Sequence, residues 1–153
     1  MSNASALLLS LKPRFADAIF SGEKRFELRR VKPRLVGGDL VVVYVTVPRC
    51  KLEGAFEVEQ VIAATPNRLW RDVQHSVGVT KAEFDAYFDG ADIGYGIEIR
   101  KVWKMEPITL AAMRRLRIRP PQSYQYLTSS TASRLTQGGN RSRKNPNSWR
   151  NKK

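Results

Sequence analysis

The segment SGEKRFELRR combines residues whose types and spacing could hold or transform an anionic group. Gly22 is placed to end a helix, and Lys24 lies where a strand begins directly afterwards. Glu27 and Arg29 are two positions apart, so both project from the same face of that strand. The cations would hold phosphate, and the glutamate would orient them or accept a hydrogen bond from a base or sugar. The pattern also fits a solvated strand face with cross-strand ion pairs, and the residues alone leave both interpretations open.

Lys24 and Glu27 could also carry acid–base catalysis on RNA. A cationic neighbourhood favours the neutral form of a lysine amine, and a glutamate can act as a base. The sequence has one histidine, His75, so a ribonuclease would need such groups or a divalent metal held by carboxylates. The acidic residues show no spacing that marks a metal site. We therefore predict no metal site and no cofactor, with a divalent metal as the alternative for a nuclease.

The sequence around this segment predicts more strands than helices. Predicted strands cover about residues 6–11, 24–30, 40–46, 53–63 and 93–105, with a further extended piece at 122–127. Predicted helices begin near Pro13, Thr65, Thr80 and Thr109. These elements do not alternate regularly, which argues against a doubly wound sheet. We therefore expect an α+β fold, a small five- to six-stranded β-barrel with short helices on its rim.

Two strands carry further information about the sheet. The β-branched run from Leu40 to Thr46 predicts a strand that is buried on both faces. In the next strand, Val58 and Val61 fall on opposite faces. This change of phase predicts a bulge near Glu59-Gln60, as closed or strongly curved sheets need.

The charge of the chain is unevenly distributed. The net charge is +13, yet no acidic residue follows Glu106, and residues 107–153 hold eleven of the 27 Lys and Arg. Such asymmetry favours a polyanion partner, of which nucleic acid is the commonest, although a solvated tail remains the alternative. From about Thr128 the composition predicts disorder. The sequence therefore predicts a domain over 6–127 and a basic tail over 128–153.

The composition also excludes several protein classes. The longest apolar run, residues 40–45, is far shorter than the ~20 residues that a membrane-spanning helix needs. The single cysteine, Cys50, rules out an internal disulfide and a multi-cysteine zinc site. Nothing at the N-terminus is typical of a signal peptide. We expect a protein of the cytoplasm that has no membrane partner.

Two tyrosines near the end of the predicted domain could contact bases. Tyr124 and Tyr126 alternate on an extended segment that follows Arg117 and Arg119. Aromatic rings among cations can stack on single-stranded bases. The same rings could instead pack the closing segment onto the barrel, and both interpretations stay open.

The SGEKRFELRR segment resembles the GxKxxExR signature of ASCH domains, which belong to the PUA-like superfamily. Gly22, Lys24, Glu27 and Arg29 match it position for position. The opening LLLSLKP and the later PPQSY are also similar to segments of the family, and the resemblance covers about residues 6–127. It implies a PUA-like β-barrel with a cleft lined by the signature. It also implies a protein that binds RNA or acts on modified nucleotides.

The resemblance implies a site and a choice of activities. We expect an RNA-binding module whose site residues are Lys12, Gly22, Lys24, Glu27, Arg29, Arg30 and Tyr124, helped by the basic tail. If the protein is an enzyme, Lys24 and Glu27 are the candidate catalytic residues. Some ASCH members are ribonucleases, and others are amidohydrolases with a catalytic lysine, threonine and glutamate. Glu27 stands at that threonine position, so an amidohydrolase is the less expected activity.

The expected partner is RNA, either single-stranded or structured. A further hypothesis is a subunit of a translation or transcription assembly, in which the basic tail docks on ribosomal RNA or on an acidic protein.

Overall fold

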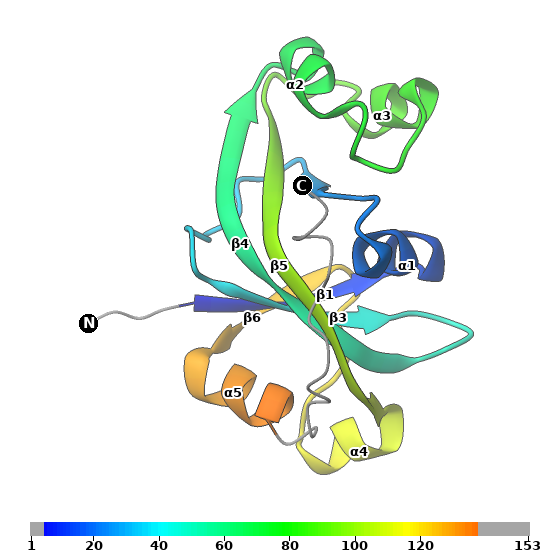
Figure 1. The fold of residues 1–153 in the computed structure, drawn as a ribbon, viewed down its shortest axis with the longest axis vertical. Coiled ribbons are helices and arrows are strands. Elements are labelled where there is room, and N and C mark those ends of the chain that lie inside the picture. Colours follow the sequence, from blue (N-terminus) through cyan, green and yellow to red (C-terminus); the bar gives the residue numbers. More distant parts are fainter. Residues whose placement is uncertain (1–4, 138–153) are drawn as a thin grey trace.

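The computed structural model describes residues 5–137, which form six strands and five helices (Figure 1). The strands are β1 (Ser5–Leu11), β2 (Phe26–Arg29), β3 (Leu40–Val45), β4 (Lys51–Ala64), β5 (Gly94–Thr109) and β6 (Tyr124–Thr128). The helices are α1 (Pro13–Ser21), α2 (Pro66–Val73), α3 (Lys81–Tyr87), α4 (Leu110–Arg115) and α5 (Ser129–Gln137). The predicted α+β class is confirmed.

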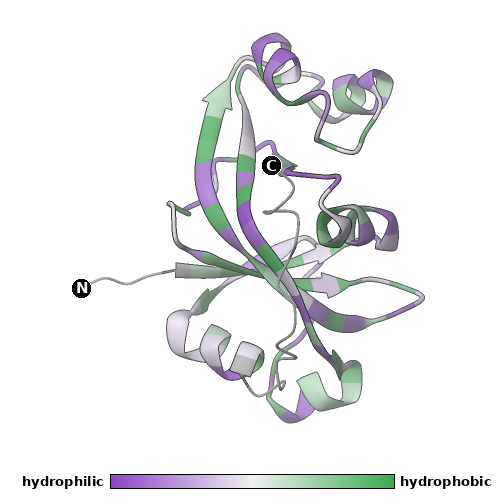
Figure 2. Ribbon diagram, viewed as in Figure 1, coloured by the Kyte–Doolittle hydropathy of each residue, from purple (hydrophilic) through white to green (hydrophobic). Residues whose placement is uncertain are grey.

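All six strands belong to one curled sheet, a half-barrel, in the order β2-β5-β4-β3-β1-β6. β1 and β3 are parallel, and the other neighbouring strands are antiparallel. The register of β4 against β5 shifts between Val58 and Gln60, which confirms the predicted bulge. Apolar and polar stretches alternate along β4 and β5 (Figure 2). This is expected where a bulge changes which side chains of a strand point toward the core. β2 and β6 are the two edges of the sheet, and the curl brings these edges toward each other.

The central strands β1 and β3 are buried on both faces. Leu7 and Leu9 of β1 pack in an inner core with Val41 and Val43 of β3, and α1 covers this core. Leu8 points the other way and packs in a second core beside α4 and α5. The prediction that the β3 strand is buried on both faces is confirmed.

A third apolar cluster holds the helices at the far end of β4 and β5 (Figure 1). Leu69 of α2 and Phe84 of α3 are fully buried there, and Leu28 of β2 joins them. The helix predicted to begin near Thr80 is α3, and it starts with a capping box in which Thr80 and Glu83 each bond the other's backbone amide. The cluster therefore fixes β2 from one side and so positions the signature residues.

The segment after Thr128 differs from the prediction of disorder. Residues 129–137 form α5, whose Ala132 and Leu135 are each 1% exposed, and Leu135 packs in the second core. These two residues lie three positions apart on one helix face, and the core supplies the apolar surface that the polar segment lacks. The remainder of the predicted tail, 138–153, lies outside the described residues, and that part of the domain division stays a prediction.

Candidate functional site

The end of α1 directs the chain into the signature strand. Gly22 has φ +91°, the left-handed conformation that glycine adopts freely, and its amide bonds the Ile19 carbonyl. Two residues later, the Lys24 amide bonds the Ala18 carbonyl at 2.9 Å. The predicted role of Gly22 in ending the helix is thus confirmed, and the turn sends the Lys24 side chain into the protein.

Lys24 is buried, with 3% of its surface exposed. Its Nζ donates to the Phe26 carbonyl at 2.8 Å and the Val77 carbonyl at 2.9 Å, and it lies 3.4 Å from Glu27 Oε1. An ammonium group has three N–H donors, so these partners occupy all of them. Gly78 packs against the lysine stem, and its φ of +77° is the left-handed conformation that glycine adopts freely. Lys24 therefore ties β2 to the loop after α2.

Glu27 lies between two cations and is only 6% exposed. One carboxylate oxygen faces Lys24, and the other accepts a hydrogen bond from Arg29 Nη1 at 3.3 Å. A buried carboxylate is stable only when it is paired and hydrogen-bonded. The burial of Lys24 and Glu27 excludes the interpretation of this segment as a solvated strand face.

Arg29 joins the two edges of the sheet. Its Nη2 donates to Ser123 Oγ at 2.7 Å, and its guanidinium lies 5.0 Å from the centre of the Tyr124 ring. Arg29 belongs to β2, Tyr124 begins β6 and Ser123 directly precedes it. The curl of the sheet thus brings its opposite edges within reach of one side chain.

A second arginine repeats this contact one step along β6. The Arg34 guanidinium lies 3.9 Å from the centre of the Tyr126 ring, and the Arg34 amide donates to Tyr126 Oη at 2.8 Å. The two tyrosine rings meet edge to face at 5.7 Å. We call Arg29, Arg34, Ser123, Tyr124 and Tyr126 the seam. Both tyrosines pack against the inner core and stay partly exposed, so packing and base contact are compatible.

Tyr87 of α3 lies against the signature strand. Its hydroxyl donates to the Leu28 carbonyl at 3.3 Å. Burial raises the pKa of Tyr87, while the positive charge of Arg29 acts in the opposite direction. The phenol is therefore a neutral hydrogen-bond donor at physiological pH. Arg30 holds the end of the same helix by donating to the carbonyls of Tyr87 and Asp89.

The chain is similar to known proteins in sequence and in fold. Residues 9–112 match the ASCH domain family. The chain belongs to that family. It is similar to an ASCH domain-containing ribonuclease of Zymomonas mobilis, with 28% identity over 130 residues, 84% of this chain and 88% of the relative. It is also 29% identical over 124 residues to large ribosomal subunit protein uL22 of Ureaplasma parvum, and that match spans 39% of the longer protein.

Solved structures of the Zymomonas mobilis ASCH protein share the fold. A serine-to-alanine variant aligns with a TM-score of 0.82 and 25% identity, covering 90% of this chain and 98% of the other. A second crystal structure aligns with a TM-score of 0.80 and 27% identity, covering 86% and 94%. These likenesses confirm the predicted family and fold class.

This ASCH domain brings together only part of the predicted site. Lys24, Glu27, Arg29 and Tyr124 form one connected cluster. Lys12 is exposed at the start of α1, and within residues 5–137 its side chain makes no hydrogen bond or ion pair to the cluster.

Sequence reasoning missed the contacts that cross the seam. Ser123 stands in the PPQSY segment that resembles the family, and this was the one available signal for it. Arg34 lies in a connection with no strand or helix pattern, so nothing indicated its contact with Tyr126.

Two further observations concern metals and membranes. In residues 5–137 of this ASCH domain, no group of three or more His, Cys, Asp or Glu side chains is placed to hold a metal ion. The same residues contain no helix that is long and apolar enough to cross a membrane. The predictions on cofactors and on a cytoplasmic location stay predictions.

Proposed function

We propose that this ASCH domain binds single-stranded RNA at the seam. The observation that carries the proposal is the position of the Arg29 guanidinium. Glu27 holds it by a hydrogen bond, and it faces Ser123 and Tyr124. Its side chain is 15% exposed, so it is fixed by buried groups yet open to a ligand. A guanidinium in a fixed orientation suits the paired oxygens of a phosphate.

The neighbours of Arg29 supply the other contacts that RNA needs. Ser123 is exposed, and its hydroxyl can donate to a phosphate oxygen while accepting from Arg29. The partly exposed rings of Tyr124 and Tyr126 offer surfaces for base stacking, worth about 1–3 kcal/mol for each base. The exposed Arg30 and Arg34 add positive charge beside them. Phosphate, hydroxyl and ring contacts within one short stretch fit a single strand with unpaired bases.

Lys24 and Glu27 act in this proposal as positioning residues. Every N–H of the Lys24 ammonium has a protein partner, and both oxygens of Glu27 face cations. The signature therefore builds a buried support that fixes Arg29, and Arg29 touches the ligand.

A second candidate function is cleavage of the bound RNA. It is favoured by the similarity to a protein named as an ASCH domain-containing ribonuclease over 84% of this chain. In cleavage by the neighbouring 2′-hydroxyl, its oxygen bonds to phosphorus and its proton passes to water, while the bond to the 5′-oxygen breaks and that oxygen takes a proton from water. Negative charge gathers on the phosphoryl oxygens during this step. Arg29 is placed to stabilise that charge, with Lys24 and Glu27 holding it in position.

The match to uL22 favours a ribosomal partner as the setting for RNA binding. The chain would then bind an exposed single-stranded segment of ribosomal RNA through the same seam. Sedimentation of the protein with ribosomes, and its loss from that fraction in an R29Q variant, would support this setting.

Binding of a fluorescent oligouridine tests the main proposal. Arg29→Gln should weaken binding about tenfold or more, since a charge-assisted hydrogen bond contributes about 1.5–3 kcal/mol. Arg68→Gln is the matched control, because Arg68 is an exposed arginine of α2 and lies outside the seam. Equal affinities of the two variants would overturn the proposal.

The same RNA, incubated with and without a divalent metal, tests cleavage. Turnover that disappears in both R29Q and K24M variants supports a ribonuclease. Turnover that survives in both comes from a contaminant and removes the second candidate.

A further inference from the structure

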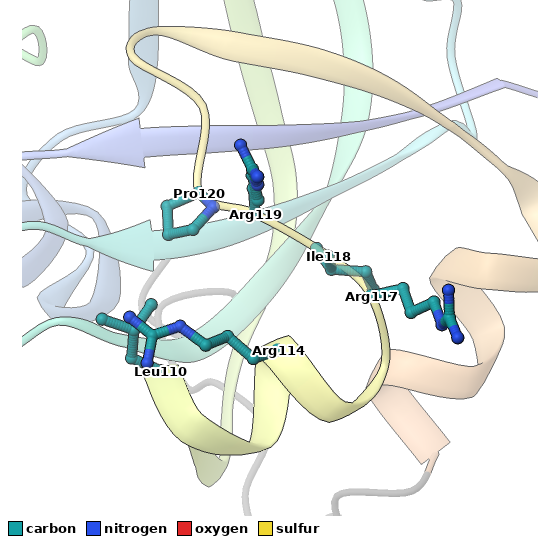
Figure 3. A pocket seen from close by; sticks show the side chains of 6 residues that line it. All are labelled: Leu110, Arg114, Arg117, Ile118, Arg119 and Pro120. Atoms are coloured by element: carbon teal, nitrogen blue, oxygen red, sulfur yellow. The ribbon is translucent and has the colours of Figure 1, made fainter.

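A second basic feature lies away from the signature, between α4 and β6. It is a pocket of about 700 Å³. Its lining residues are Leu110, Arg114, Arg117, Ile118, Arg119 and Pro120 (Figure 3). We call it the arginine pocket, and none of its arginines belongs to the signature or to the seam.

The three arginines have no acidic partner. All are exposed, and within residues 5–137 their side chains form no hydrogen bond or ion pair. No acidic residue follows Glu106 in the sequence, so the surrounding segment is purely basic. Arg114 lies in the last turn of α4, where a cation complements the helix dipole, but Arg117 and Arg119 lie beyond the helix. Neither the helix nor a neighbouring carboxylate accounts for those two charges.

Arg117 has a backbone conformation that an arginine rarely adopts. Its φ is +64°, and its amide bonds the Arg114 carbonyl while the Ile118 amide bonds the Met113 carbonyl. This is the Schellman arrangement at a helix end, in which the left-handed position is usually glycine. Ile118 and Met113 are buried together, as the motif requires. An arginine that carries strain where glycine fits better, and that has no partner among residues 5–137, indicates a role for its charge.

The directions of the three side chains limit what they can bind together. Arg114 extends toward Leu110, Arg117 extends the opposite way, and Arg119 projects beside Pro120 (Figure 3). A single phosphate cannot touch guanidinium groups that diverge in this manner. An extended chain of phosphates can pass each of them in turn.

We propose that the arginine pocket holds the phosphate backbone of the same RNA strand that binds at the seam. The inference rests on the proposed function. From Arg119 to Tyr124 the chain advances five residues, which span at most about 17 Å. Ser10 fixes this connection, because its hydroxyl donates to the Pro121 carbonyl at 2.7 Å and its amide to the Ser123 carbonyl at 2.9 Å. The pocket and the seam are thus held at one distance that a short stretch of single-stranded RNA bridges.

The test compares the full-length triple variant R114Q/R117Q/R119Q with R68Q/R71Q/K101Q, which removes the same charge from exposed positions elsewhere. An oligouridine of about 12 nucleotides is titrated at several salt concentrations. Loss of three phosphate contacts to a single strand should reduce the salt slope of log K by about 2. A uridine trinucleotide, followed by NMR, should bind the wild type and the R114Q/R117Q/R119Q variant equally at the seam.

Equal salt slopes for the two triple variants would overturn the inference. Oligouridine binding that depends on Arg29 but not on the arginine pocket would overturn the inference and leave the proposed function standing. Wild-type protein that binds no oligouridine, or an R29Q variant that binds as tightly as wild type, would overturn the proposed function itself.

Discussion

Replacing Lys24 by methionine should destabilise the domain strongly. The side chain is buried, and the change removes the donor from two backbone carbonyls and one cation from the buried Glu27. Breaking a buried ion pair by removing one partner costs about 3–5 kcal/mol. Glu27 keeps its hydrogen bond from Arg29, so its carboxylate retains one of its two cationic partners.

The size of this effect can be measured by urea denaturation. A domain has a total stability of about 5–15 kcal/mol, so K24M should remain folded in water but lose a large part of that margin. With an m-value of about 2 kcal/mol/M, the midpoint should fall by about 2 M urea. Lys81→Met is the matched control, because its ion pair with Asp85 is about half exposed, at 53% and 58%. That exposed pair should contribute less than about 1 kcal/mol.

A double variant separates the charge from the packing. K24M/E27L replaces both charged partners by apolar groups and should be more stable than K24M alone, because no carboxylate that has lost one of its two cations stays buried. The reasoning is refuted if K24M and K81M unfold at the same urea concentration. It is also refuted if K24M/E27L is less stable than predicted by adding the losses in free energy of unfolding measured for K24M and for E27L separately.

Three further outcomes follow from other parts of the fold. Leu135→Ala should cost about 2–5 kcal/mol in urea denaturation because it opens a cavity under α5, and no loss would mean that this helix is not docked. Arg117→Gly should raise stability by about 1 kcal/mol through relief of the left-handed backbone, and a lower stability would contradict the Schellman assignment. The hydrogen bond from Arg14 lowers the pKa of Glu83 to about 2. A carboxyl with a lowered pKa stabilises the fold above its ordinary value of 4.5 and loses that contribution as pH falls toward 2. An E83Q variant should show a shallower loss of thermal stability over that pH range, and an unchanged profile would contradict this.

Much of the local structure could be predicted from the sequence because it depends on near neighbours. Gly22 ends α1, the Thr80–Glu83 pair caps α3, and the phase change near Gln60 marks the bulge in β4. Each of these features is set by residues a few positions apart. The core strands were also predictable, since an unbroken run of β-branched residues is rarely exposed on either face.

The seam could not be predicted, because it depends on contacts between distant parts of the chain. Arg29 and Ser123 are 94 positions apart, and they meet only because the whole sheet curls. The burial of Lys24 also depends on the loop that carries Val77, which no local pattern indicated. α5 was missed for a related reason: its Leu135 gains its burial from a core that other elements build.

The seam also explains how one feature can serve structure and function. The order of strands leaves β2 and β6 as open edges, and side chains rather than backbone hydrogen bonds connect them. An edge closed by side chains leaves polar groups that a ligand can reach. This places the exposed part of Arg29 where the two edges of the described sheet, β2 and β6, face each other.

The central claim is most directly tested by mapping where RNA touches the protein. Oligouridine that carries 4-thiouridine is crosslinked to the full chain by light, and the crosslinked peptides are identified by mass spectrometry. The account predicts crosslinks in residues 120–128 of the closing segment and in residues 26–34, which face it across the seam. Crosslinks confined to α2 and α3, with none in either of these segments, would contradict it.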